Sequence, residues 1–425
     1  MMEKLLIKNI RIPDPDTRKI QIADILLARS KSREEGRIIE ISETIQAEDA
    51  RVMDGEGGYL LPCFCDIASD FCQPGYEYRE TIETGSLSAF YGGYSHVMLT
   101  PDTKPFADSA SVLEDIDRIS KATARCHILK CGALTKSGRG LELCDYDKLS
   151  GNGALCFSDG NFPRHDMRLL RLAMLECAGK DHMIMLTPVR DPLYPDSTMT
   201  CGSAARLLSA PAEPPSSEAR TVASYLILAE ETGCRIHLRN ISTAASVEAV
   251  RAAKQKGIRV SASTSPMYFS FTDNDTVFIG SNAKVYPPLR SQSDRDAVIR
   301  GLVDSTIDCI ESSHIPLSLM EKAGGMESAR FGAIGLQTVF GCAVTYLLSA
   351  GHIDIYRLID LLSVQPRRIL GLTPVNKVDK DCNAFVLCDM SKEIILTSSY
   401  LKGRSTNCPY IGMSLCGEVV KTFIL

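Results

Sequence analysis

The sequence lacks any long run of apolar residues. No segment approaches the roughly 20 apolar residues needed to cross a bilayer, and the opening residues, MMEKLLIK, lack the apolar stretch of a signal peptide. Neither a basic stripe nor an acidic tail is present, and 47 Lys and Arg residues against 52 Asp and Glu give a formal net charge of −5. Nucleic-acid and membrane-surface binding therefore have no electrostatic support. We expect a cytoplasmic protein whose partners are small molecules or other proteins.

Cysteine pairs with the spacing of a zinc or redox motif are also missing. The chain has 16 cysteines, but none forms a Cys-x-x-Cys pair. Several lie in apolar segments, as do Cys156, Cys234, Cys309 and Cys342. A cytosolic chain of this length needs no disulfide framework, so we interpret the cysteines as buried free thiols.

Short apolar segments alternate with helical segments from about residue 60 to residue 370, as in parallel βα units. The pattern predicts strands at 60–67, 94–100, 126–134, 154–158, 183–187, 235–242, 259–264 and 306–311. Helical spacing of apolar residues predicts helices between them at 111–125, 167–178, 218–232, 246–256 and 294–303. Eight strands in this alternation predict an α/β fold of the (β/α)8 barrel type.

Both ends of the chain are rich in β-type segments, such as Lys4–Ile10 and Glu418–Leu425. We expect residues 1–59 and 375–425 to pair into one composite domain, a small β-sandwich. Residues 60–374 would then form the barrel domain.

Several segments together point to one family. They are PGYEYRETIETG at 74–85, PDTKP at 101–105, FSD at 157–159, ISTAASV at 241–247, PPLR at 287–290, DSTID at 304–308, GAIGLQT at 332–338 and KGRSTNCPY at 402–410. In these segments the sequence resembles bacterial dihydroorotase nearly from end to end. The resemblance implies an amidohydrolase-type barrel, a place in pyrimidine biosynthesis, and a zinc centre that activates water to hydrolyse a cyclic amide.

The residues that would hold the family's metal are missing. The family's first barrel strand ends in Asp-x-His-x-His, whose two imidazoles hold the metal. Here Asp66 is kept, but Ala68 and Asp70 stand at the histidine positions. A third family histidine falls at or near Leu186 and a fourth at Asn240. Alanine and leucine offer no lone pair, and a neutral amide is a poor zinc ligand. We therefore expect no cofactor, or zinc if the site has been rebuilt.

The family's catalytic and substrate-binding positions are changed as well. Its proton-transferring aspartate corresponds to Ser313, which cannot shuttle a proton near neutral pH unaided. The arginine that would bind the substrate carboxylate is Cys72, the asparagine next to it in the site is Asp102, and a closing histidine is Leu317. Because the family's substrates are anions, Asp102 would repel them by roughly 1 kcal/mol or more at close range.

A rebuilt metal site is one alternative. Cys63, Cys65 and Cys72 lie near Asp66 and Asp70 on the first strand, and Asp159 follows the fourth strand. Thiolates and carboxylates can hold a metal. However, active sites of barrel proteins are found at the barrel mouth, and Cys63 lies several residues below it. Structural thiols are therefore the preferred interpretation.

A second alternative is a different enzyme. It would keep a barrel-mouth pocket with Asp70, Asp102, Asp159, His314 and Cys72, and would act on a neutral or cationic cyclic amide. Against this, His314 and His237 are interpreted as structural histidines. His165 and His182 are interpreted as solvated or hydrogen-bonded residues and not as ligands.

These losses predict a dihydroorotase-like protein that is catalytically inactive. The resemblance also implies a role, because some bacteria pair aspartate carbamoyltransferase with an inactive dihydroorotase-like subunit that holds its trimers in a larger complex. We expect that carbamoyltransferase as a partner, and a homodimer, which the family commonly forms. The alternative hypothesis is a hydrolase of the same class that cleaves a C–N bond of a cyclic amide in a rebuilt site.

Overall fold

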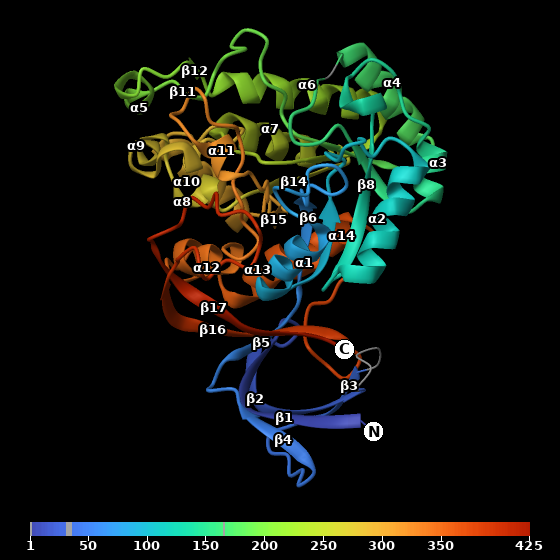
Figure 1. Ribbon diagram of the computed structural model, residues 1–425, viewed down its shortest axis with the longest axis vertical. Helices are drawn as coiled ribbons and strands as arrows, with labels where there is room; N and C mark the ends of the chain where they lie inside the picture. Colours follow the sequence, from blue (N-terminus) through green and yellow to red (C-terminus); the bar gives the residue numbers. More distant parts are fainter. Residues whose placement is uncertain (1, 31–35, 165) are drawn as a thin grey trace.

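The computed structural model describes residues 2–30, 36–164 and 166–425. His165, interpreted above as a solvated residue, lies outside these ranges. The described chain has two bodies, a barrel surrounded by helices and a smaller β domain that contains both chain ends (Figure 1).

Within the described ranges, the barrel sheet has eight parallel strands whose order in space follows their order in sequence. They are β6 (Phe64–Ser69), β7 (Tyr94–Leu99), β8 (His127–Ala133), β9 (Ala154–Ser158), β10 (Met183–Leu186), β13 (Arg235–Leu238), β14 (Val260–Thr264) and β15 (Cys309–Ile310). A parallel bridge between Ser69 and His314 joins the two edges of the sheet and nearly closes the barrel. The predicted barrel is confirmed.

Three predicted strands differ from the observed ones, and one of them, predicted at 235–242, ends at Leu238 in β13. Residues 60–67 are split, because β5 (Tyr59–Pro62) pairs with the β domain and only β6 belongs to the barrel. Residues 306–311 contribute only β15, because the Asp308 carboxylate accepts the backbone N–H of Ala262 at 2.7 Å and takes the place of a ladder partner.

Helices follow the strands and cover the outside of the barrel (Figure 1). The longer ones are α1 (Ile82–Tyr91), α2 (Ala110–Thr123), α3 (Tyr146–Gly151), α4 (Met167–Ala178), α6 (Ser216–Thr232), α7 (Ala244–Gln255) and α10 (Gln292–Val303). Shorter segments are α5 (Ser203–Leu207), α8 (Met267–Ser270), α9 (Thr276–Ile279), α11 (Leu319–Lys322), α12 (Val339–Ala343), α13 (Ile355–Ile359) and α14 (Gln365–Ile369). Side chains of Thr81, Asp166 and Thr243 cap α1, α4 and α7, so these helices start where capping chemistry allows.

The two chain ends share one sheet. In the described part of the chain its strands are β1 (Met2–Asp14), β2 (Lys19–Ser30), β3 (Gly36–Ser42), β4 (Ala50–Asp54), β5, β16 (Ala384–Ile395) and β17 (Ser414–Ile424). Antiparallel pairing of β5 with β16 joins the N-terminal and C-terminal parts. Buried side chains from both parts, including Ile25, Leu60 and Phe385, form its core. The pairing of both chain ends into one β sheet is confirmed, while the division into domains at residues 59 and 375 stays a prediction.

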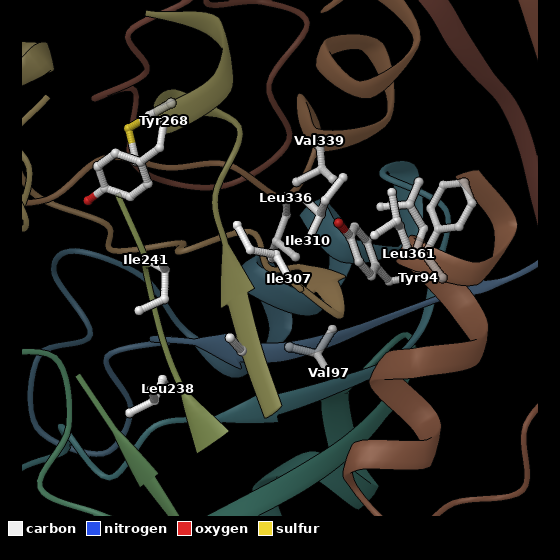
Figure 2. Close-up of a cluster of buried hydrophobic side chains, with 14 of the residues drawn as sticks. Tyr94, Val97, Leu238, Ile241, Tyr268, Ile307, Ile310, Leu336, Val339 and Leu361 are labelled. Atoms are coloured by element: carbon white, nitrogen blue, oxygen red, sulfur yellow. The ribbon is translucent and has the colours of Figure 1, made fainter. Parts of the chain in front are cut away.

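The apolar core has two parts at the barrel. The larger part lies between the barrel strands and the helices that cover them. Figure 2 shows Val97, Leu238, Ile310 and Leu361 within it. The smaller includes sulfur-containing side chains of the strands: Cys65, Met98, Cys131, Cys156, Met183, Met185 and Cys309. All 16 cysteines lie in the described ranges and are free, and most are buried, which confirms the interpretation as thiols. Among the described helices, none has the length and apolarity to cross a membrane.

Candidate functional site

A cavity of about 1010 Å³ opens at the carboxyl ends of the barrel strands. We call it the mouth cavity. Loops that follow β6 to β10 and β15 line it, which is where barrel enzymes carry their sites. Its polar lining near the strand ends comes from Asp70, Asp102 and Asn161. Its aromatic lining comes from Tyr76, Phe106, Phe162 and Phe331, and its arginines are Arg79, Arg139, Arg164, Arg190 and Arg330.

Asp70 and Asp102 are brought together at this cavity. Asp102 accepts hydrogen bonds from the backbone and side chain of Asn161 at 3.1–3.2 Å. Asp70 accepts the backbone N–H of Cys72 at 2.7 Å. Burial and the neighbouring charge of Asp102 raise the pKa of Asp70 to about 7, and burial also raises the pKa of Asp102. Near neutral pH the two carboxyls therefore share less than two negative charges.

Two more of the positions where the resemblance expects a histidine, Ala68 and Leu186, lie in different parts of the core. Ala68 is buried in the sulfur-rich cluster, whereas Leu186 is buried in the larger cluster between strands and helices. The next residue along β10, Thr187, turns toward the site and accepts a long hydrogen bond of 3.4 Å from Arg239. Thr187 is therefore the site-facing residue of this strand end, where the sequence suggested a position at or near Leu186.

Asn240 and Ser313, a metal position and the acid–base position of the family, contact each other. The Asn240 side-chain amide donates to Ser313 Oγ at 3.1 Å. Both residues have positive φ, 53° and 47°, and both are buried. Backbone in this region is uncommon for residues other than glycine and is found at functional sites. The two residues that the resemblance aligns with a metal ligand and with the proton-transferring aspartate thus lie in uncommon backbone and contact each other.

Asp66 closes the barrel seam. Its carboxylate accepts the Ser312 backbone N–H at 2.7 Å, the Ser312 hydroxyl at 2.7 Å and the Ser69 hydroxyl at 2.6 Å. Burial raises the pKa of Asp66 to about 6, although these hydrogen bonds lower it in part. The first aspartate of the family motif is therefore fully used in joining β6 to the segment after β15.

Arg239 is the functional residue that the sequence analysis missed. It follows β13, is less than 2% exposed, and its Nε donates to Glu311 Oε2 at 2.9 Å. Its Nη1 donates to Asn161 Oδ1 at 3.2 Å. Burial alone would lower the pKa of Arg239, but the charges of Glu311, Asp102 and Asp66 raise it above its usual value. A permanent cation thus lies inside the barrel mouth.

The remaining predicted residues have structural contacts. Asp159 accepts the backbone N–H and hydroxyl of Thr135 at 2.7 and 2.8 Å. The ring nitrogens of His237 lie 2.8 and 2.9 Å from Ser261 Oγ and Ser263 Oγ, which links β13 to β14. Burial lowers the pKa of His237 to about 3, so the ring is neutral.

Three further predicted residues lie in the loop after β15 or against it. His314 Nδ1 accepts the Gly335 N–H at 3.3 Å, and burial lowers the His314 pKa to about 3. Cys72 is buried with Sγ 3.9 Å from the Pro316 carbonyl oxygen, and Leu317 packs at the mouth cavity. Like Asp159, neither His314 nor Cys72 is among the cavity-lining residues in the described part of the chain.

The donor set does not fit a zinc ion. Across the described residues, no three histidine, cysteine, aspartate or glutamate side chains are grouped so that they could hold a metal. Cys63 and Cys65, considered for a rebuilt site, are buried, and burial raises the pKa of both thiols, to about 12 for Cys65. A thiolate ligand is therefore disfavoured there.

The loop after β15 is fixed over the mouth cavity. Glu321 Oε2 accepts Arg79 Nε at 2.9 Å and Oε1 accepts Arg330 Nη1 at 2.8 Å. Burial alone would raise the pKa of Glu321, but these arginines lower it to about 2. Lys322 is buried beside it and donates to the carbonyl oxygens of Lys284, Arg330 and Gly332 at 3.0–3.3 Å.

Comparison with solved structures shows the fold. The chain is similar to the L-hydantoinase of Arthrobacter aurescens, with a TM-score of 0.84, 21% identity, and coverage of 100% of this chain and 95% of that one. It is also similar to the dihydropyrimidinase of Brevibacillus agri NCHU1002, with a TM-score of 0.80, 16% identity, and coverage of 99% and 93%. The fold is that of the cyclic amidohydrolases.

Sequence comparison defines the family. Residues 57–246 match the family model described as dihydro-orotase-like. The chain is 34% identical over 403 residues to a dihydroorotase of Thermoanaerobacter sp. strain X514, which covers 95% of this chain and 92% of the relative. It is 33% identical over 421 residues to a dihydroorotase of Ruminiclostridium cellulolyticum, with coverage of 99% and 97%. The chain belongs to the dihydroorotase family.

Proposed function

We propose that this chain is a non-catalytic dihydroorotase homologue that works in the cytoplasm, in pyrimidine biosynthesis, as a structural partner of aspartate carbamoyltransferase. Family membership supports the pathway. The inactivity is supported by a single arrangement: the buried Arg239–Glu311 ion pair lies beside the hydrogen-bonded Asn240 and Ser313. Hydrolysis in this family needs a metal-activated water and a proton acceptor, and neither has its residues here.

Loss of the substrate carboxylate site supports the same proposal. Cys72 is buried, and burial raises the pKa of its thiol, so it supplies no positive charge. Asp102 adds a carboxyl where the family has a neutral donor. At the strand ends an anionic substrate would meet repulsion from Asp70 and Asp102, and Arg79 is held by Glu321. The other arginines of the mouth cavity are Arg139, Arg164, Arg190 and Arg330.

The partner is tested with purified proteins. We expect the chain, which we propose to be a homodimer, and the carbamoyltransferase trimer of the same organism to sediment together at micromolar concentration as a species larger than either. Each protein alone serves as the control. Separate sedimentation of the two proteins would contradict the proposed partnership. In a parallel assay, dihydroorotate hydrolysis should stay at the background rate with and without added zinc.

A hydrolase with a rebuilt site is the second candidate, and one observation favours it. Asp70 and Asp102 converge on an open cavity, and a carboxyl with a pKa of about 7 is suited to proton transfer near neutral pH. A neutral or cationic cyclic amide would be the matching substrate. Turnover of such an amide that Asp70→Asn abolishes would establish this candidate, and no turnover across neutral and cationic cyclic amides would reject it.

A further inference from the structure

Arg239 reaches across the interior of the barrel mouth. It starts after β13, yet its guanidinium contacts Asn161 after β9 and Thr187 after β10 on one side, and Glu311 after β15 on the other. Contacts with residues on both sides of β13 place the guanidinium inside the ring of strand ends. Asn240, where the resemblance places a metal ligand, directly follows Arg239, and Asp159, considered for a rebuilt site, lies two residues before Asn161.

The charge around Arg239 is the kind that a metal would otherwise balance. Glu311 is fully buried and pairs with Nε, while the Glu311 Oε1 accepts the backbone N–H of Asn240 at 2.9 Å. The charges of Asp102 and Asp66 act on Arg239 in addition. Buried carboxylates are costly unless a cation or several donors compensate them. The guanidinium supplies that cation at a fixed position.

We propose that Arg239 is a permanent internal cation that takes the place of the family's metal centre and holds the barrel mouth together without metal. A guanidinium cannot lose its proton in the physiological range, so a divalent ion cannot displace it as it displaces protons from histidine or cysteine. A metal in the same space would also meet like-charge repulsion. The proposal concerns the chain alone and does not depend on the carbamoyltransferase.

Arg239 also positions the mouth cavity. Its Nη1 holds the Asn161 side-chain oxygen, and Asn161 in turn donates to both carboxyl oxygens of Asp102. The charge of Arg239 lowers the pKa of Asp102 against the effect of burial. Asp102 is further influenced by the carboxyls of Asp70 after β6 and Asp159 after β9 and by the buried thiol of Cys131 on β8.

The test compares two buried arginines. Arg239→Met removes the proposed cation, and Arg290→Met removes a second arginine that is equally buried and paired with Glu213 and Glu218 at 3.3 and 3.4 Å. We expect each variant to lower the Tm by roughly 5 to 10 °C, because each leaves a buried carboxylate unpaired. The Arg239→Met/Glu311→Gln double variant should recover most of that loss.

The distinguishing readout is the titration of Asp102, followed by carbon-13 NMR of labelled aspartate carboxyls and assigned with Asp102→Asn. The Asp102 pKa should rise in Arg239→Met and stay unchanged in Arg290→Met. The wild-type Tm should be the same with and without EDTA. An unchanged Asp102 pKa in Arg239→Met, or a wild-type Tm that falls with EDTA, would overturn the proposal.

Discussion

Single residues show how the polar groups of this barrel mouth are bound to one another. Asn240 donates to Ser313, Asp66 is held by Ser69 and Ser312, and Arg239 pairs with Glu311. Most of these polar groups thus have partners within the protein, whereas Asn240 Oδ1 and Arg239 Nη2 are buried without a hydrogen bond. Such compensation is what a buried polar cluster needs once its metal is gone.

The first prediction concerns Asp70, whose pKa of about 7 lies above the usual value near 4. The folded state therefore binds more protons than the unfolded state between about pH 4 and pH 7, and stability falls as the pH rises through this window. Asp70→Asn should stabilise the protein by about 1 to 2 kcal/mol at pH 8 and by much less at pH 5. The asparagine oxygen can still accept the Cys72 N–H.

Chemical denaturation at both pH values measures this effect. Asp381→Asn, a change at an exposed loop aspartate, is the control and should leave stability unchanged at both. If Asp70→Asn destabilised the protein equally at pH 5 and pH 8, ionisation of the buried Asp70 carboxyl would not be what lowers stability at high pH.

Residue identity could be predicted from the sequence only in part. The lost ligands at Ala68 and Asn240 were recognisable because the flanking family segments fix their positions. Arg239 was missed, because a charged residue just past an apolar strand is usually solvent-exposed. A signal was present: Arg239 directly precedes a family metal position at the carboxyl end of a barrel strand, where side chains face the site.

Among the elements, the loop after β15 differs most from what the sequence could establish. Leu317 to Ala329 could have been ordered or mobile, and no periodic pattern decides this. The structure fixes the loop through charge: Glu321 joins Arg79 to Arg330, and the ammonium of Lys322 binds three carbonyl oxygens. Arg79 and Lys284 are distant from this loop in the sequence, and the contacts with Arg330 and Gly332 span 8 to 10 residues, so local propensity reveals neither kind.

The second prediction tests this loop through Glu321, whose pKa the two arginines lower to about 2. A lowered folded-state pKa gives stability that is present above pH 4.5 and is lost as the pH falls toward 2. Glu321→Gln should therefore cost about 1 to 2 kcal/mol at pH 6 and nothing near pH 2.

The matched control is Glu114→Gln on the exposed face of α2, which should leave the acid limb of the stability curve unchanged. Equal stability of wild type and Glu321→Gln at pH 6 would show that the loop is not held by this carboxylate.

The strands and helices themselves followed the sequence closely because their signals are local. Short apolar segments and helical spacing placed the barrel strands and the helices α4, α6, α7 and α10 within a few residues. The errors fell where a side chain or a distant segment intervened. Asp308 shortened β15, and pairing with β16 drew residues 59–62 into the β domain.

The whole molecule keeps the architecture of its family, while the residues at the family's metal and catalytic positions differ. Both chain ends build one sheet, the barrel is nearly closed at the Asp66 seam, and a cavity of about 1010 Å³ remains at its mouth. A fold that hosts many functions can lose its chemistry and keep its surfaces, and assembly with another protein needs only the surfaces. This is why the proposed inactivity and the proposed structural role belong together.

The most direct test is the metal content of the purified, untagged chain, measured by plasma mass spectrometry after growth with added zinc and purification without chelators. The account predicts far less than one zinc ion per chain, because Arg239 supplies the central cation and the described donor groups do not converge. One or two zinc ions per chain would contradict it and would make the hydrolase with a rebuilt site the better account.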